Sequence, residues 1–470
     1  MLFNSPLFLF IFLPLIFAIF LAAPRRWRNI ALLVGSCGFY AWGEPRFIFV
    51  VLLSAVFDWL LGRQLAVTAG TARGRLLLGL GVLANAAVLV YYKYFNFLLE
   101  NLNGLLSQFG VAPLGFAGVL LPIGVSFIVF EKITYLVDIY RKTGEPSESL
   151  FDYLTYVFLF PKLLAGPIVK YHEIAGQLKR HEVSWDNAYA GVSRFGLGLA
   201  KKVFIADTAS EVADMIFQLP AAELGFGNAW LGLLCFTLQI YFDFSAYSDM
   251  AIGLARIFGF TLRENFNMPY ISQNFTEFWT RWHISLSSWI KEYIYIPLGG
   301  SRCSERRRYL NLWLSFLLSG IWHGANWTFV LWGVYHGLFI VLDKLFWLKL
   351  QQRLPRLLNV AVTFFFVMLG WAIFRSADLG QAGSYLQLLL QPFASSWAVI
   401  YLTANQTFFI GLGLLLVFLP LSPLLQPARA WSAGSRWAGA LQAVLLLAGV
   451  LISIGKIATT TFQPFLYFRF

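Results

Sequence analysis

A histidine lies deep inside one of the longest apolar stretches of the chain. His323 falls within residues 310–337, directly after the basic run Arg306–Arg308. Basic residues mark the cytoplasmic edge of a membrane-spanning segment, so a continuous helix would carry His323 roughly 22 Å inward. An ionisable side chain at that depth is costly and normally faces a protein interior or a wet cavity. Because a neutral imidazole can take a proton from a hydroxyl group and return it, the position predicts general-base catalysis of acyl transfer to an alcohol.

Two neighbours of His323 carry groups that could orient it or bind a substrate. Trp322 precedes it, and Asn326 follows three positions later, close enough on a helix to reach the imidazole. The alternative for His323 is a structural role between packed helices, and for Trp322 packing is the simpler role. His336 lies further along the same predicted helix, on roughly the opposite side, so it is not expected to share the site.

A second polar group interrupts an earlier apolar run. Residues 239–253 read QIYFDFSAYSDMAIG and place Gln239 and Asp243 among apolar neighbours. Buried carboxylates need partners. Satisfying broken helices is the simpler interpretation, and substrate binding by Gln239 and Asp243 is the functional alternative.

Residues 274–296 form an amphipathic segment with a histidine near its polar border. At about 100° per residue, one face of a helix would carry Phe278, Trp282, Leu286, Trp289 and Tyr293, and the other Arg281, Ser285, Ser288 and Glu292. His283 falls between the faces. With four charged residues, this helix is not expected to cross lipid alone, so it should lie at the interface or dip into the protein. There it could form the cytoplasmic floor of a cavity.

The composition specifies the elements that must hold these residues. Hydrophobic residues make up 59% of the chain and charged residues 12%, which is typical of a membrane protein. Repeated apolar runs without the alternating pattern of a barrel predict an all-α, polytopic protein of about 10–13 helices. Proline and glycine interrupt the middle third, and broken helices at membrane depth require buried backbone or water. We therefore expect re-entrant helices around a central passage, in a single domain over 1–470 whose catalytic motifs lie in 122–337.

The net charge and the spacing of cysteines and histidines disfavour several classes of function. The net charge of +12 comes from basic residues scattered through loops, so membrane topology explains it better than nucleic-acid binding does. The three cysteines have no close spacing, so no disulfide framework is expected, and no histidine spacing predicts a metal site. His172 and His181 lie in the polar loop 170–187, where a structural role is expected.

Four motifs in order resemble the membrane-bound O-acyltransferase family. They read LLAGPIVKY at 163–171, YFDFSAYSDMAIG at 241–253, NFNMPYISQNFTEFWTRWHISLSSWIKEYIYIPLGG at 265–300, and SGIWHGANW at 319–327. The similarity covers the whole chain and is greatest to the branch that O-acetylates alginate and other bacterial polysaccharides. A departure is Glu131-Lys132, where many relatives carry uncharged residues, so the role of this part of the passage stays open.

The resemblance implies an enzyme that moves acetyl groups from a cytoplasmic thioester toward an extracytoplasmic polysaccharide. It makes His323 the family's catalytic histidine, His283 its second signature histidine, and Asn267 a candidate for substrate binding. Acetyl-coenzyme A is the implied donor, and no permanently bound cofactor is expected. The implied setting is the bacterial inner membrane, with lipid around the protein and an extracytoplasmic SGNH-type acetyltransferase or similar partner that completes transfer to the sugar hydroxyls.

Two other functions stay open on the sequence alone. A related branch of the family moves D-alanine toward teichoic acid, and the motifs around His323 do not separate the two cargoes. A polysaccharide or lipid transporter would use His323 as a proton relay instead of a base for acyl transfer.

Overall fold

The computed structural model describes residues 1–180, 183–220, 224–393, 396–421, 436–459 and 464–468. His181 therefore lies outside the described residues. Helices make up the regular structure of the described part, which contains no strand. The all-α prediction is confirmed.

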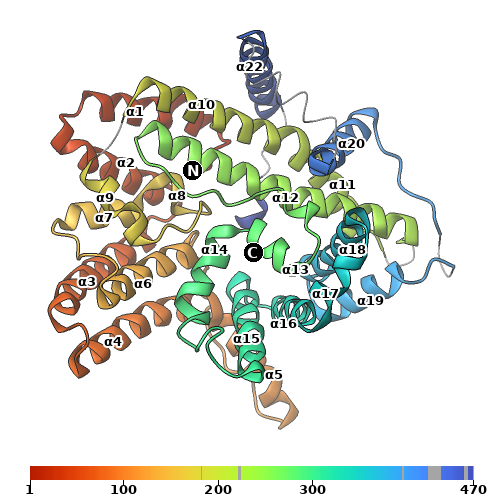
Figure 1. Ribbon diagram of the computed structural model, residues 1–470, viewed down its shortest axis with the longest axis horizontal. Helices are drawn as coiled ribbons and strands as arrows, with labels where there is room; N and C mark the ends of the chain where they lie inside the picture. Colours follow the sequence, from red (N-terminus) through yellow and green to blue (C-terminus); the bar gives the residue numbers. More distant parts are fainter. Residues whose placement is uncertain (181–182, 221–223, 394–395, 422–435, 460–463, 469–470) are drawn as a thin grey trace. The chain divides into compact units, whose positions relative to one another are not determined.

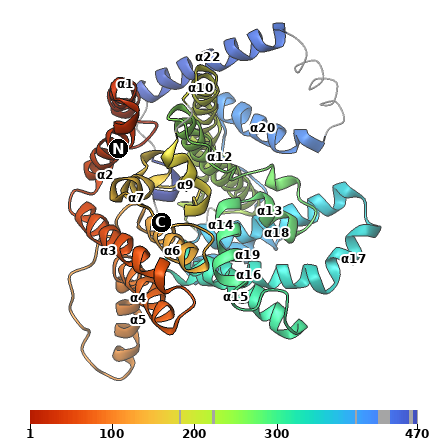
Figure 2. The same ribbon diagram turned by 60° about the vertical axis from the view of Figure 1, so that its left-hand side comes forward.

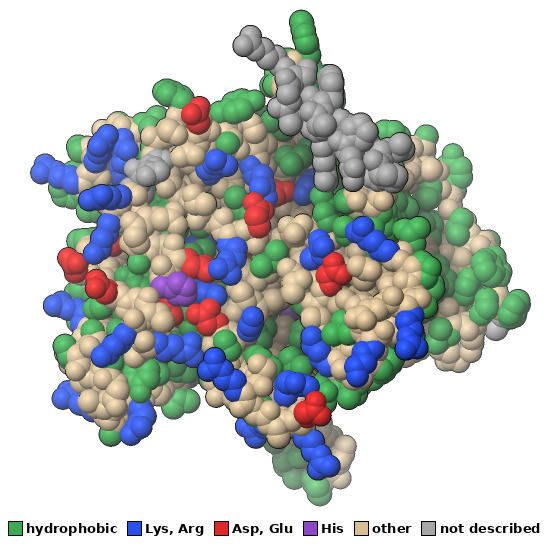
Figure 3. Space-filling view, viewed as in Figure 1, with side chains coloured by type: hydrophobic (Ala, Val, Ile, Leu, Met, Phe, Trp, Pro, Cys, Tyr) green, Lys and Arg blue, Asp and Glu red, His purple; other side chains and the backbone are tan. Residues whose placement is uncertain are grey.

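Seven described helical segments are long and apolar enough to cross a membrane. They are Phe47–Thr68, Ala72–Gln108, Phe226–Ile257, Trp327–Arg353, Arg356–Arg375, Ala404–Leu421 and Trp437–Thr459. A shorter apolar helix spans Phe8–Ala22. The protein is therefore a multi-pass membrane protein, and its remaining helices are shorter or broken. Lys and Arg side chains are scattered over the visible face together with acidic ones (Figure 3).

The chain divides into two compact units, and the first comprises Met1–Val192 and Ala251–Arg263. Its helices are α1 (Leu13–Ala22), α2 (Arg28–Gly43), α3 (Phe47–Thr68), α4 (Ala72–Leu89), α5 (Phe95–Gln108), α6 (Val125–Arg141), α7 (Leu150–Phe158), α8 (Phe160–Leu163), α9 (Tyr171–Lys179) and the first part of α10 (Trp185–Ala200). Helices α3 and α4 both pack against α6 (Figures 1 and 2). Gly81 allows this close approach, since a Cβ there would lie 2.6 Å from a methyl carbon of Leu136 on α6.

Helix α6 of this first unit holds buried charges in ion pairs. Glu131 pairs with Lys162 of α8, and Lys132 pairs with Asp58 of α3 at 3.1 Å. All four side chains are at most 2% exposed. The pair Glu131-Lys132, whose role the sequence leaves open, thus neutralises two further buried charges.

The second unit comprises Ser193–Met250 and Glu264–Phe470. Its helices include the end of α10, α11 (Asp207–Phe217), most of α12 (Phe226–Ile257), α13 (Phe275–Arg281), α14 (Ile284–Ile290), α15 (Glu305–His323), α16 (Trp327–Leu342), α17 (Leu348–Leu350), α18 (Arg356–Arg375), α19 (Leu379–Leu389), α20 (Ala404–Phe418) and α22 (Arg436–Thr459). An aromatic-rich core joins α11, α12, α13, α16 and α18.

The helix predicted from Arg308 to His323 is confirmed by α15, but its predicted continuation to His336 is wrong, because α15 ends at His323 and α16 begins at Trp327. The two helices form a tightly packed antiparallel hairpin in which Gly320 faces Gly333. A Cβ at Gly320 would lie 2.3 Å from the carbonyl oxygen of Phe329, so only glycine permits this approach. His323 and His336 consequently lie on neighbouring helices, although the apolar pattern runs through both without interruption.

The single amphipathic helix predicted over 274–296 is also wrong. The segment breaks into α13 and α14 at His283, whose backbone adopts the left-handed conformation with φ 44°. Both Trp282 and Ser285, predicted on opposite faces, are buried, at 2% and 1% exposure. The break turns this segment into the protein interior, which removes the two-face arrangement of an interfacial helix.

Candidate active site

His323 occupies the last residue of α15 and is 8% exposed. Its Nδ1 lies 2.7 Å from the carbonyl oxygen of Ser319, one helical turn earlier. A carbonyl oxygen can only accept a hydrogen bond, so Nδ1 must carry the proton. The neutral ring therefore has its basic lone pair on Nε2, the form that a general base needs.

His323 lines a small cavity of about 30 Å³, here named the histidine cavity. This volume suffices for about one water molecule. The other lining residues are Ile240, Asp243, Phe244, Trp282, Trp371, Phe374, Leu466 and Tyr467. Most of them are apolar, and the rings of Trp332 and Phe374 lie 4.9 Å and 5.7 Å from the His323 ring. In such surroundings an electrostatic or hydrogen-bonding group acts more strongly than it would in water.

Asp243 enters the same cavity from α12, but its charge is compensated. Lys202 donates to one carboxylate oxygen at 2.6 Å, and the backbone N–H of Leu466 donates to the other at 2.6 Å. Lys202 also contacts the carbonyl oxygen of Pro464 at 3.3 Å. The ion pair thus fixes the C-terminal segment 464–467 as one wall of the cavity.

His283 is fully buried at the junction of α13 and α14. Burial, reinforced by nearby His323, holds the pKa of His283 well below its ordinary value. Trp322 connects the two histidines, with ring centroids 6.2 Å from His283 and 5.1 Å from His323. Phe244, which lines the histidine cavity, packs edge-on against His283 at 4.7 Å. The two predicted catalytic histidines therefore belong to one cluster.

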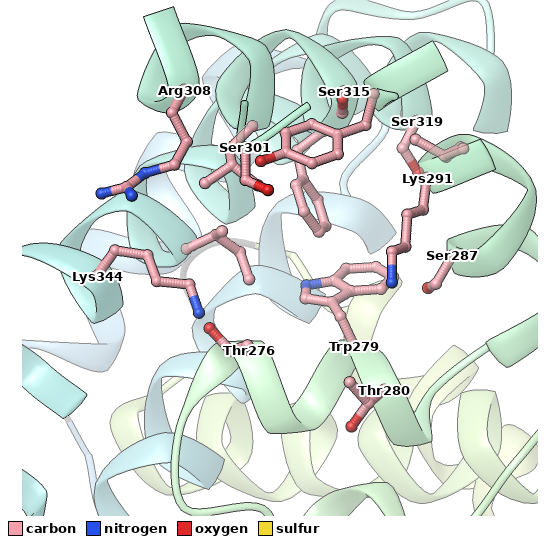
Figure 4. Close-up of a pocket in the computed structure, with 15 residues that line it drawn as sticks. Thr276, Trp279, Thr280, Ser287, Lys291, Ser301, Arg308, Ser315, Ser319 and Lys344 are labelled. Carbon is pink, nitrogen blue, oxygen red and sulfur yellow. The ribbon is translucent and has the colours of Figure 1, made fainter. Parts of the chain in front are cut away.

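A larger cavity of about 500 Å³ lies beside the α15–α16 hairpin (Figure 4). We name it the cationic cavity, because Lys291, Arg308 and Lys344 come to it from three different elements. Its other lining residues are Thr276, Trp279, Thr280, Ser287, Ile290, Tyr295, Ser301, Leu312, Ser315, Phe316, Ser319 and Ile340. Arg308 pairs with Glu305, whereas in the described part of the chain no ion pair involves either lysine. Its size and its combination of apolar wall and cations suit an elongated anionic ligand.

The other residues predicted for the site have different surroundings in the structure. Trp322 lies between the two histidines, as described above. Asn326 caps α16 by accepting from the backbone N–H of Thr328 at 3.0 Å, and it donates to the carbonyl oxygen of Ala377 at 2.8 Å. Asn267 is exposed on the segment before α13, and buried Gln239 donates to Ser210 at 2.9 Å. Neither Asn267 nor Gln239 lines the histidine cavity or the cationic cavity.

Several residues of the site escape a sequence-based search. Lys291, Arg308 and Lys344 come to the cationic cavity from three separate elements, so no local spacing predicts that they lie together. Asn265 bonds His283 from 18 positions away, and Tyr467 reaches the histidine cavity from the end of the chain. The basic run at 306–308 contributes Arg308 to the cavity, but in the sequence this run predicts only membrane topology.

His336 packs against Trp332, which is also a neighbour of His323. Its ring centroid lies 4.5 Å from that of Trp332, which in turn contacts His323. His336 is fully buried among aromatic rings and lines neither cavity. His172, predicted to be structural, lies in the first unit, where its Nδ1 is 2.8 Å from Asp138.

Comparisons with known proteins agree with the motifs. Residues 146–375 match the membrane-bound O-acyltransferase family. The probable alginate O-acetylase AlgI of Pseudomonas putida is 39% identical over 493 aligned positions, covering 100% of both chains. The peptidoglycan O-acetyltransferase of Helicobacter pylori is 37% identical, covering 81% of this chain and 78% of its own. This chain belongs to the membrane-bound O-acyltransferase family.

Family membership confirms the prediction of an acyltransferase. The transporter interpretation is accordingly not favoured. A teichoic acid D-alanyltransferase of Bacillus subtilis is more distant, at 28% identity over 54% of this chain and 68% of its own. Transfer of D-alanine is therefore not favoured either.

Proposed function

We propose that this acyltransferase moves acetyl groups from cytoplasmic acetyl-coenzyme A toward an extracytoplasmic polysaccharide. One observation carries the proposal: Ser319 lines the cationic cavity, while its carbonyl oxygen holds the imidazole of His323, which lines the histidine cavity. A single helical turn of α15 therefore links a space suited to the donor with the predicted base.

The cationic cavity supports a coenzyme A thioester as the donor. Coenzyme A carries phosphates at one end and a slender, largely uncharged pantetheine arm at the other. Lys291, Arg308 and Lys344 supply the charges that phosphates need, and Trp279 and Phe316 supply an apolar wall for the arm. The buried side chains of Ser315 and Ser319 line the same cavity on α15.

The proposed chemistry needs one base and no metal. Nε2 of His323 takes the proton of an acceptor hydroxyl, and the oxygen attacks the carbonyl carbon of the thioester. The tetrahedral intermediate then collapses, the carbon–sulfur bond breaks, and the imidazolium returns the proton to the departing thiolate. The products are an acetyl ester and free coenzyme A, with the histidine back in its neutral form.

A charged, bulky donor does not cross a bilayer, whereas an acetyl group can be passed through a protein. We propose that the acetyl group is handed to an extracytoplasmic SGNH-type acetyltransferase or similar partner, which completes transfer to the polymer. This route places the protein in the bacterial inner membrane. The full-length similarity to a probable alginate O-acetylase supports an alginate-like exopolysaccharide as the final acceptor. Peptidoglycan is the second candidate, because the Helicobacter pylori relative bears that name.

Labelled donors test the proposal directly. Membranes containing the protein and its neighbouring gene products would receive acetyl-coenzyme A labelled in the acetyl group, or a labelled D-alanyl carrier. The expected result is acetyl label in an extracytoplasmic polysaccharide, at a level that His323→Ala reduces to background. Alanyl label in the polymer, or equal acetyl label with His323→Ala, would overturn it. Isolating alginate-like polymer and peptidoglycan separately shows which one carries the label.

A further inference from the structure

Three hydrogen-bond donors converge on one buried side-chain oxygen beside the second histidine. Asn265 is fully buried on the extended segment before α13. Its Oδ1 lies 2.9 Å from Oγ of Ser285, 3.1 Å from the backbone nitrogen of Ser285 and 3.2 Å from Nδ1 of His283. All three contacts bridge chain segments 18 to 20 positions apart.

The backbone contact determines where the imidazole proton lies. A backbone N–H can only donate, so the Asn265 atom facing Ser285 is the oxygen and not the amide nitrogen. Nδ1 of His283 faces the same oxygen at 3.2 Å and donates to it, because the hydroxyl of Ser285, which lies 3.5 Å from Nδ1, gives its proton to Asn265 at the shorter distance of 2.9 Å. Nε2 then carries the lone pair of the neutral ring.

Nε2 of His283 is an unfilled acceptor. It is buried and has no hydrogen-bond partner among the described residues. Buried polar atoms in folded proteins nearly always have a partner, so an exception calls for a specific explanation. Because His283 contacts Trp322 and Phe244 next to the histidine cavity, a bound substrate is the natural source of the missing donor.

Asn265 also holds the backbone around His283. The backbone N–H of Ile284 donates to the carbonyl oxygen of Asn265 at 2.9 Å, and that of Asn267 donates to the carbonyl oxygen of Arg281 at 2.9 Å. These two bonds join the segment before α13 to the break between α13 and α14. A left-handed histidine is uncommon and persists only where its surroundings enforce it. The same asparagine thus fixes both the backbone and the ring of His283.

We propose that Asn265 is a positioning residue for acyl transfer: its side-chain oxygen keeps the proton of His283 on Nδ1, so that Nε2 accepts a hydrogen bond from an N–H or O–H group of the substrate. The amide N–H groups of a pantetheine arm have this chemistry. The inference rests on the proposed function for the identity of the substrate, but the tautomer of His283 is a property of the protein alone.

Two substitutions of Asn265 distinguish a positioning role in catalysis from a purely structural role. Asn265→Asp keeps an accepting oxygen but adds a negative charge beside Nδ1–H, which stabilises the imidazolium and raises the pKa of His283. Since Nε2 accepts only in the neutral ring, the acid limb of the pH–rate profile should move upward by about 1 to 3 pH units. Asn265→Leu removes the accepting oxygen and should lower kcat about tenfold to hundredfold at every pH.

The test requires that the other ionisable groups around His283 keep their protonation state. His323 acts electrostatically on His283, Asp243 is already paired with Lys202, and Tyr467 lies near Phe244. None of them is altered in either variant. Asn359→Asp on α18 is the matched control, because Asn359 is 1% exposed, donates to a backbone oxygen at 2.9 Å and lines neither cavity. This control should leave the pH–rate profile in place, whatever its effect on the yield of folded protein.

The tautomer itself can be observed without catalysis. In protein labelled with ¹⁵N-histidine, the His283 signals, assigned by their loss in His283→Gln, should show a protonated Nδ1 and an unprotonated Nε2. A proton on Nε2, or an Asn265→Asp profile that coincides with the wild-type profile, would overturn the inference. Absence of acetyl transfer by the wild-type protein would instead contradict the proposed function, and the spectrum would still decide the tautomer.

Discussion

Two groups of buried ionisable residues, one in each compact unit, serve different purposes. In the first unit, two deeply buried charges of α6 are each paired with an opposite charge, Glu131 with Lys162 and Lys132 with Asp58. In the second unit, Nδ1 of each buried catalytic histidine faces an oxygen that fixes the tautomer of the ring, the carbonyl oxygen of Ser319 for His323 and Oδ1 of Asn265 for His283. Compensated charges support a structure, whereas a neutral imidazole with a defined basic nitrogen is ready to move a proton.

The largest expected effect comes from removing the predicted base. His323→Ala should lower acetyl transfer by roughly 10²- to 10⁴-fold, because no other histidine among the described residues lines the histidine cavity. The matched control is His172→Gln in the first unit, where the imidazole lies 2.8 Å from Asp138 and lines neither the histidine cavity nor the cationic cavity. Transfer rates per folded protein measure the contrast, and comparable losses in the two variants would erase the distinction between the units.

Breaking an ion pair in the first unit should affect stability more than chemistry. Glu131→Ala leaves the ammonium of Lys162 buried without compensation and should destabilise the fold by about 3–5 kcal/mol. The double variant Glu131→Leu with Lys162→Met removes both charges and should recover most of that loss. Unfolding in detergent provides the measurement. A single variant as stable as the wild type would show that the pair is not needed to compensate buried charge.

The lysines of the cationic cavity represent a third situation, in which a ligand is expected to supply the opposite charge. Lys291→Gln and Lys344→Gln should each raise the KM for acetyl-coenzyme A about threefold to tenfold while leaving kcat nearly unchanged. The effect should shrink at high salt. Lys349→Gln on α17, outside the cavity, is the control, and an equal rise in KM there would remove support for a specific donor site.

The smallest expected effect is a pH dependence of stability from His283. Burial holds the pKa of His283 below its ordinary value of 6.5, so below that pH the unfolded chain binds a proton that the folded protein does not. Stability should therefore fall as the pH is lowered below about 6.5, by up to about 1.4 kcal/mol per pH unit from this group. Comparing unfolding at pH 6.5 and 5.5 in wild-type protein and in His283→Gln should give a flatter dependence in the variant. Parallel curves would mean that the imidazole is not held neutral.

The sequence predicted the class of fold because apolar content and helix periodicity are local properties. It also identified His323 and His283, since an ionisable residue in an apolar run is visible without any knowledge of packing. Predictions from the local pattern are wrong where the backbone turns. Neither the end of α15 at His323 nor the left-handed residue at His283 interrupts the apolar pattern, so both segments were predicted as continuous helices.

The site depends on contacts that no spacing rule records. Asn265 reaches His283 across 18 positions, and Asp243 reaches Leu466 across 223. Asn326 caps the next helix, and its role in orienting His323 or binding substrate stays a prediction. The predictions for substrate binding by Asn267 and Gln239 stay predictions.

What the amino-acid sequence determined by itself is a helical membrane acyltransferase with two histidines in its central motifs, because composition, periodicity and motifs are all written along the chain. Only the tertiary structure decided which nitrogen of each histidine holds the proton and which cations share a cavity. The acceptors that fix the proton on His283 and the three cations of the cavity come from separate segments, and their meeting depends on helix packing and on hydrogen bonds across the fold.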